Sequence, residues 1–129
     1  MSRPLLYGLS IYFFTNAALM WAAPQFWYEM VPGVLQTGGF NSHFIRDVAL
    51  AFVVSALALA SAAHLRDQRL ALFGAAWPGL HAVFHIWIWA MHREATIDLI
   101  SLTNLLGIQV PAWAAFYAAI QLNTEEASQ

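Results

Sequence analysis

The residues best suited to chemistry in this sequence are its five histidines and a few carboxylates that lie in or beside apolar segments. His81 and His85 stand four apart in H-A-V-F-H, so on a helix their imidazoles share one face. Imidazoles spaced one helical turn apart are common metal ligands. His43 and Asp47 have the same spacing, which predicts an imidazole and a carboxylate on a second shared face.

The elements that must position these residues are predicted by composition. The chain has 129 residues, of which 60% are hydrophobic and 9% charged, whereas soluble domains carry roughly 25% charged residues. Four apolar runs cover residues 5–23, 43–64, 70–92 and 97–122. Each is close to the roughly 20 residues that a helix needs to cross a bilayer. We therefore expect an all-α integral membrane protein, with residues 1–129 forming a single domain of four transmembrane helices.

The connections between these runs predict their arrangement. The second and third links are short, which favours antiparallel neighbours and an up-down-up-down bundle. Asn41 or Ser42 can cap the second helix. Pro78 and Pro111 fall inside the third and fourth runs and predict kinks there.

Charge and cysteine usage limit the partners and the orientation. The absence of cysteine excludes disulfides and thiolate metal sites. A net charge of −2 without a basic cluster argues against nucleic acid as a partner. We expect the lipid bilayer as one partner, and a larger membrane complex or a homo-oligomer as another. We expect a multi-pass protein of the bacterial inner membrane, and the distribution of arginine favours both termini in the cytoplasm. Arg3, Arg66 and Arg69 are expected on the cytoplasmic side, and Arg46 and Arg93 are expected on the other side.

Most polar side chains of the four runs are expected in the outer half of the membrane. Depth follows from 1.5 Å of rise per residue, counted from each helix midpoint. The outward distances are about 6 Å for His85, 16 Å for His92, 10 Å for Asp47, 16 Å for His43, 8 Å for Asn104 and 16 Å for Asp98. His64 falls at the opposite interface, where we expect it to have no role.

Two layers of candidate site residues follow from these depths. The rim layer holds His43, His92 and Asp98, a set of ligands suited to Fe, Zn or Cu. The deeper layer holds the metal-ligand pair His81 and His85, with Asp47 as a carboxylate that would orient an imidazole, and with Asn104. Arg46, beside Asp47, is expected to reach the head groups or turn toward the mouth of the bundle. The candidate ligand-binding set is His43, Arg46, Asp47, His81, His85 and Asn104.

Three functions stay open at this point. The first is binding of a transition metal or a small polar-headed ligand in this His/Asp pocket, within a larger membrane complex. The second is acid–base chemistry or proton transfer on a lipophilic substrate or quinone, with Asp47 and His85 as the candidate catalytic groups. The third is a structural, accessory subunit. Bis-His haem is disfavoured because His43 and His85 differ in depth by about 10 Å.

The stretch P-G-V-L-Q-T-G-G-F-N-S-H-F-I-R-D, residues 32–47, also resembles a family of small bacterial four-helix membrane proteins. That family has a signature of the form Pro-Gly-Val…Thr-Gly-x-Phe-Asn-x-His-Phe-x-Arg-Asp and no established activity. The resemblance covers this loop, the second helix and, more loosely, the third. It implies importance for Asn41, His43, Arg46 and Asp47, and it implies no reaction.

Overall fold

The computed structural model describes residues 2–92 and 97–127, with side chains over 2–91 and 97–122. The described residues form helices joined by short connections and contain no strand. In chain order the elements are α1 (Ser2–Ala22), α2 (Pro24–Met30), the 3-10 helix η1 (Val34–Thr37), α3 (Ser42–Leu65), α4 (Gln68–His92), α5 (Leu99–Thr103), the π-helix η2 (Asn104–Gln109) and α6 (Val110–Ala127). The prediction of an all-α chain is confirmed.

Each of the four predicted apolar runs is a helix long and apolar enough to cross a membrane. These helices cover Ser2–Ala22, Ser42–Leu65, Gln68–Met91 and Leu99–Leu122. The structure adds two features that were not expected. The first connection carries α2 and η1, and the last apolar run is divided into α5, η2 and α6.

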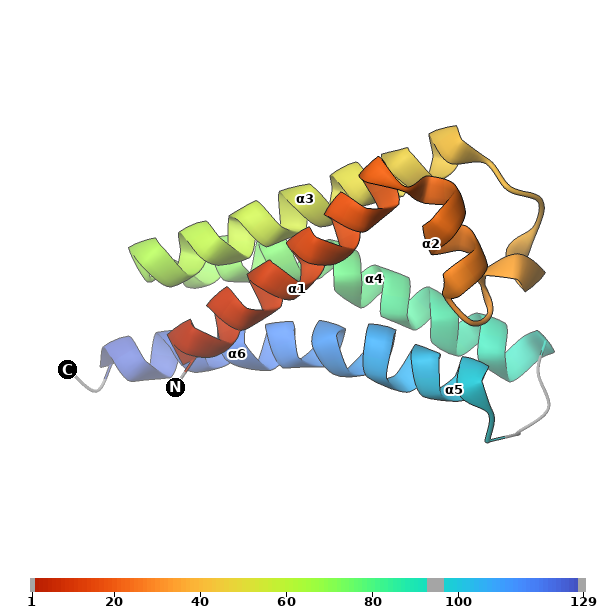
Figure 1. Ribbon diagram of the computed structural model, residues 1–129. Coiled ribbons are helices and arrows are strands. Elements are labelled where there is room, and N and C mark those ends of the chain that lie inside the picture. Colours follow the sequence, from red (N-terminus) through yellow and green to blue (C-terminus); the bar gives the residue numbers. More distant parts are fainter. Residues whose placement is uncertain (1, 93–96, 128–129) are drawn as a thin grey trace.

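The long helices form a closed ring in which α1 packs on α3, α3 on α4, α4 on α6, and α6 on α1 (Figure 1). Two arginines join the ends of the first pair. Arg3 Nε donates to the Ala63 carbonyl at 2.8 Å, and Arg46 Nε donates to the Trp21 carbonyl at 3.2 Å. Each arginine begins one helix and binds an end carbonyl of the other, so α1 and α3 are antiparallel. Both bonds satisfy carbonyls that a helix end leaves without an internal partner.

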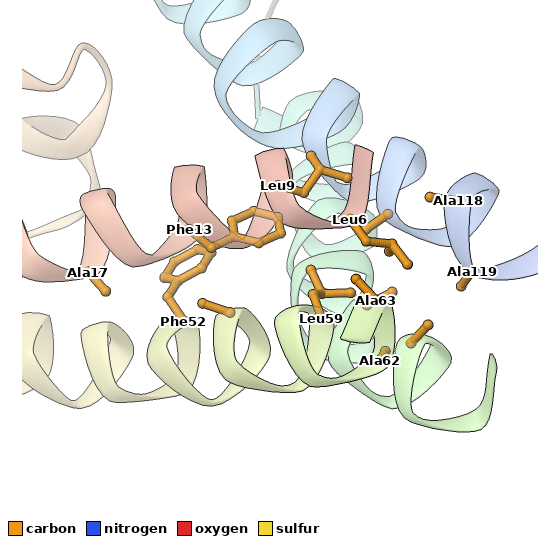
Figure 2. Packing of buried hydrophobic residues seen from close by; sticks show 14 of the residues in the cluster. Leu6, Leu9, Phe13, Ala17, Phe52, Leu59, Ala62, Ala63, Ala118 and Ala119 are labelled. Atoms are coloured by element: carbon orange, nitrogen blue, oxygen red, sulfur yellow. The ribbon is translucent and has the colours of Figure 1, made fainter. Parts of the chain in front are cut away.

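The end of the ring that carries both termini and the α3–α4 turn, here called the closed end, is tightly packed. Figure 2 shows Leu6 of α1 among Leu59 of α3 and Ala118 and Ala119 of α6. Leu6 and Leu59 are both 0% exposed. A Cβ added to Gly74 of α4 would lie 3.0 Å from the Leu59 backbone nitrogen, so glycine allows α3 and α4 to approach closely.

The opposite end, here called the open end, carries α2, η1 and α5, and α3 and α4 diverge toward it (Figure 1). The α1–α3 pair stays packed there, with Met20 and Ile45 buried. Residues 83–109 comprise the second half of α4, the following connection, α5 and η2. No described side chain in this range is buried. The fold therefore leaves the second half of α4 without a buried described side chain, as it does α5 and η2.

Proline explains the π-helix. In a regular helix the N–H of residue 111 would donate to the Gly107 carbonyl, but Pro111 has no N–H. The Tyr12 hydroxyl donates to that carbonyl at 2.8 Å instead, and the Val110 N–H donates to the Leu105 carbonyl in the π-helical pattern. The predicted disturbance at Pro111 is thus a π-helical segment, whereas α4 continues through Pro78.

Candidate functional site

The most distinctive polar feature within the bundle is the imidazole pair on α4. The His81 and His85 ring centroids are 4.5 Å apart, with the rings at 62° to each other. Both side chains are half-buried. The prediction that the two imidazoles share one helical face is confirmed, because rings this close must project in the same direction.

Aromatic side chains surround this pair. Trp77, one turn before His81, stacks on its ring at 5.7 Å and 23°. Phe52, from the middle of α3, meets the His81 ring edge-on at 6.0 Å. Phe84 meets the His85 ring edge-on at 6.1 Å. His81 therefore lies in the α3–α4 interface, and His85 lies one turn nearer the open end.

The ring nitrogens of His81, His85 and Trp77 form no hydrogen bond with a described residue. Neither His81 nor His85 forms a hydrogen bond with any described residue, and the indole Nε1 of Trp77 is buried without a partner among them. A neutral imidazole offers one donor and one acceptor, and an indole offers one donor. A buried polar group left unpaired costs about 1–3 kcal/mol, which applies to the indole N–H of Trp77, and the two half-buried imidazoles beside it offer further unpaired nitrogens.

His43 and Asp47 lie on one face of α3, as their spacing predicted, and they pair with each other at its exposed first turns. Asp47 Oδ2 lies 3.4 Å from His43 Nε2, and the two side chains are 57% and 89% exposed. The carboxylate expected to orient a deep imidazole therefore pairs with a rim imidazole on its own helix. Asn41 caps α3 by accepting from the His43 and Phe44 N–H groups, both at 3.1 Å, which confirms the predicted cap.

Arg46, expected to reach the head groups or the mouth of the bundle, is engaged with α1. Besides its bond to the Trp21 carbonyl, its guanidinium lies 5.9 Å from the centroid of the Trp21 ring. Asn104 is engaged within its own segment, since its side-chain oxygen accepts from Gln109 Nε2 at 3.2 Å. Arg46 and Asn104 therefore each form contacts within the fold that do not involve the His81–His85 pair.

The predicted rim set is only partly described. Asp98 caps α5 through a reciprocal pair of bonds with Ser101, each 2.8 Å long. The His92 side chain lies outside the described residues, so the set of His43, His92 and Asp98 stays a prediction. Over the described ranges 2–92 and 97–127, no three His, Cys, Asp or Glu residues are grouped to hold a metal. Within that part of the chain, His81 and His85 form a pair without a third such residue grouped with them.

Sequence reasoning missed several members of the site. Trp77 could have been found, because Trp77, His81 and His85 follow one another at intervals of four. Phe52 carried no such signal, since its place depends on how α3 packs on α4. The same is true of Gln109, whose Nε2 donates to the Ala82 carbonyl at 3.0 Å and joins η2 to α4.

No protein-family model, curated protein or solved structure matches this chain. The resemblance of residues 32–47 to a family of small membrane proteins stays a prediction. An assignment of function therefore depends on the residues and their geometry alone.

Proposed function

We propose that this chain is an integral membrane protein with four spans, and that its His81–His85 pair binds the polar head of a small lipophilic ligand. The observation that carries the proposal is the half-buried pair of imidazoles with no hydrogen-bond partner among the described residues, next to the unpaired indole N–H of Trp77.

The outward faces of the helices support a membrane location. Exposed large apolar side chains occur on all four of the long apolar runs, whereas soluble monomers rarely expose such continuous apolar surface. Examples are Ile11 at 67%, Leu57 at 58%, Leu80 at 69% and Ile120 at 55% exposure. The close approach at Gly74 and the alanine-rich contacts are typical of membrane helices. Arg3, Arg66 and Arg69 favour a cytoplasmic closed end, with the bacterial inner membrane as the site.

The chemistry of the pair favours an organic ligand. Protein sites for transition metals usually supply three or four side-chain ligands, and the described part of the chain groups fewer. Two imidazoles and an indole N–H suit a carbonyl or hydroxyl head, and the Phe52 and Trp77 rings suit an apolar or planar body. A quinone-like molecule has both parts.

The first connection spans the open end of the ring. Trp27 of α2 donates through Nε1 to the Asn16 side chain of α1 at 2.9 Å. Farther along, Gly33 adopts a φ of 97°, and a Cβ there would lie 2.8 Å from Ile100 Cγ2 of α5. The connection therefore reaches from α1 to α5 at the end of the ring toward which His85 lies.

A bound Cu, Zn or Fe ion is the second candidate, and the spacing of the imidazoles favours it. Such an ion would need further ligands beyond the pair, from a bound anion or from residues outside the described ranges. Acid–base chemistry through Asp47 and His85 has less support, because Asp47 pairs with His43 at the surface.

The test compares detergent-purified wild type with His81→Leu and His85→Leu. Organic extracts are analysed by mass spectrometry, and metal content is measured on the same samples. We expect a lipophilic molecule in the wild type that both variants lose. His64→Leu, which removes an exposed imidazole at the closed end, is the matched control and should retain it.

Other results would redirect the assignment. Near-stoichiometric metal that disappears in the His81 and His85 variants would establish the second candidate. Identical extracts and no metal in all four proteins would contradict ligand binding at this pair and support an accessory subunit.

A further inference from the structure

A second feature with unused polar groups lies at the closed end. An open groove of about 400 Å³ is lined by Tyr7 of α1 and by four residues of α3, which are Ala60, Ser61, His64 and Leu65. Positions 60, 61, 64 and 65 share one helical face. The groove therefore follows the seam between α1 and α3 on the outside of the ring, away from the His81–His85 pair.

The lining combines polar and apolar groups. The Tyr7 and Ser61 hydroxyls and the His64 imidazole are exposed, and none of them forms a hydrogen bond with another described residue. Ala60 and Leu65 supply the apolar wall. Three unpaired hydrogen-bonding groups around one concave surface suit a ligand rich in oxygen atoms.

Arginine supplies positive charge beside the groove, although carboxylates balance it over the closed end as a whole, where Arg3, Arg66 and Arg69 stand against Asp67, Glu125 and Glu126. Arg3 lies one turn before Tyr7, and its bond to the Ala63 carbonyl holds it at the end of α3, next to the backbone of the residue that precedes His64. A guanidinium has five N–H donors, so others remain after this bond. Arg66 and Arg69 follow at the same end, where the nearby Asp67 carboxylate accepts from the Leu70 N–H.

The helix ends themselves add little net charge at the groove. The C-terminal end of α3 is partly negative and the N-terminal end of α1 is partly positive, and the two lie side by side. Their opposite partial charges oppose one another, which leaves the arginine side chains as the groups near the groove that attract an anion.

The surface next to the groove is apolar. Ile11 follows Tyr7 by one turn on α1, and Leu57 precedes Ser61 by one turn on α3. These side chains are 67% and 58% exposed. The groove is therefore flanked by exposed apolar side chains that suit contact with a hydrocarbon chain, whereas a free phosphate ion would make no such contact.

We propose that this groove binds an anionic phospholipid, with the phosphate between Arg3, Tyr7 and His64 and one acyl chain along Ile11 and Leu57. Basic side chains near a membrane surface attract anionic lipids, which agrees with this assignment of Arg3. The inference rests on the membrane-spanning part of the proposed function and is independent of the ligand at His81 and His85.

Native mass spectrometry of the detergent-purified protein tests the inference. Phosphatidylglycerol and phosphatidylcholine with identical acyl chains are titrated separately. We expect tighter binding of phosphatidylglycerol, and a loss of about fivefold in Arg3→Gln that phosphatidylcholine binding does not show. Arg46→Gln is the matched control, because Arg46 makes the same kind of Nε bond to a helix-end carbonyl at the open end.

A second variant tests the shape of the groove. Ser61→Phe fills the groove from an exposed position and leaves the packed core in place. It should abolish the preference for phosphatidylglycerol, and inorganic phosphate should not displace the lipid. Equal binding of the two lipids by the wild type would overturn the inference. The same conclusion follows if Arg3→Gln and Arg46→Gln have equal effects, if Ser61→Phe keeps the preference, or if inorganic phosphate displaces the lipid.

Failure of this inference can be told apart from failure of the proposed function. If the protein separates with the membrane fraction but binds both lipids equally, only the lipid site is wrong. If it separates with the soluble fraction, the membrane-spanning proposal fails as well. His81→Leu should leave the lipid preference unchanged.

Discussion

The two ends of the helix ring differ in how tightly their side chains are packed and in how many polar atoms lack a hydrogen bond. At the closed end, leucine, alanine and glycine fill the space between α1, α3, α4 and α6, and the Arg3 bond joins two helix ends. At the open end, α3 and α4 diverge, and the second half of α4 presents imidazoles and aromatic rings with unused polar atoms (Figure 1). The contrast indicates that the closed end stabilises the fold and that the open half of α4 is available to a ligand.

Removing a large side chain from the closed end should produce the largest loss of stability. Leu59→Ala leaves a cavity among α1, α3 and α6, where Leu59 is 0% exposed. We expect the free energy of unfolding to fall by about 2 kcal/mol, near the lower end of the range for buried leucines because lipid replaces water as the solvent. Unfolding in mixed micelles with increasing denaturing detergent measures this loss.

The neighbouring Leu57→Ala is the control for this change. Leu57 is 58% exposed, so its truncation leaves no cavity, and the unfolding midpoint should stay close to that of the wild type. Equal losses in the two variants would mean that the closed end is not the packed centre of the fold.

Two glycines should respond with opposite signs to the same substitution. A Cβ at Gly74 would lie 3.0 Å from the Leu59 backbone nitrogen, so Gly74→Ala forces α3 and α4 apart and should destabilise the protein by about 1–2 kcal/mol. A Cβ at Gly8 meets nothing within 4 Å, so Gly8→Ala should stabilise α1 by about 0.5–1 kcal/mol. The same detergent titration measures both changes, and a stabilising Gly74→Ala would refute the close contact.

The hydroxyl of Tyr12 should matter because of Pro111. Tyr12→Phe leaves the Gly107 carbonyl without its 2.8 Å partner and should cost about 1 kcal/mol. In Pro111→Ala a backbone N–H becomes available for that carbonyl, so Tyr12→Phe should cost less there. A double-mutant cycle on unfolding free energies measures this coupling. Independent, additive losses would show that proline and tyrosine do not share the carbonyl.

Local sequence patterns predicted the helices and the imidazole pair, because both depend on residues of one segment. The apolar runs are long, and a spacing of four fixes a shared face wherever a helix forms. The pairing of His43 with Asp47 is equally local and agrees with their predicted shared face, although the interpretation by depth linked Asp47 to a deeper imidazole. Depth along an axis was a poorer guide than the helical turn that joins the two residues.

Contacts between helices could not be predicted in the same way. Three contacts depend on which helix faces which. They are the bond from Arg46 to the Trp21 carbonyl, the edge-on contact of Phe52 with His81, and the bond from Gln109 to the Ala82 carbonyl of α4. Nothing in a single apolar run specifies its rotation about its own axis when all its faces are apolar. The π-helix had one local signal, Pro111, but the partner of the released carbonyl came from α1.

The smallest effect on stability should come from the residue most important for the proposed ligand. His81 forms no hydrogen bond with a described residue, so His81→Leu removes an unpaired polar group and preserves volume, and the unfolding free energy should change by less than about 0.5 kcal/mol. Gln109→Leu is the contrasting variant. It removes the 3.0 Å acceptor of Trp113 Nε1 and the bond to the Ala82 carbonyl of α4, so the unfolding free energy should fall by about 1 kcal/mol. Detergent unfolding of both variants, beside the extraction assay, separates folding from binding. If His81→Leu instead destabilises the protein as strongly as Leu59→Ala, the imidazole contributes to the packing of α3 on α4. The proposal that the open end binds a ligand is then contradicted.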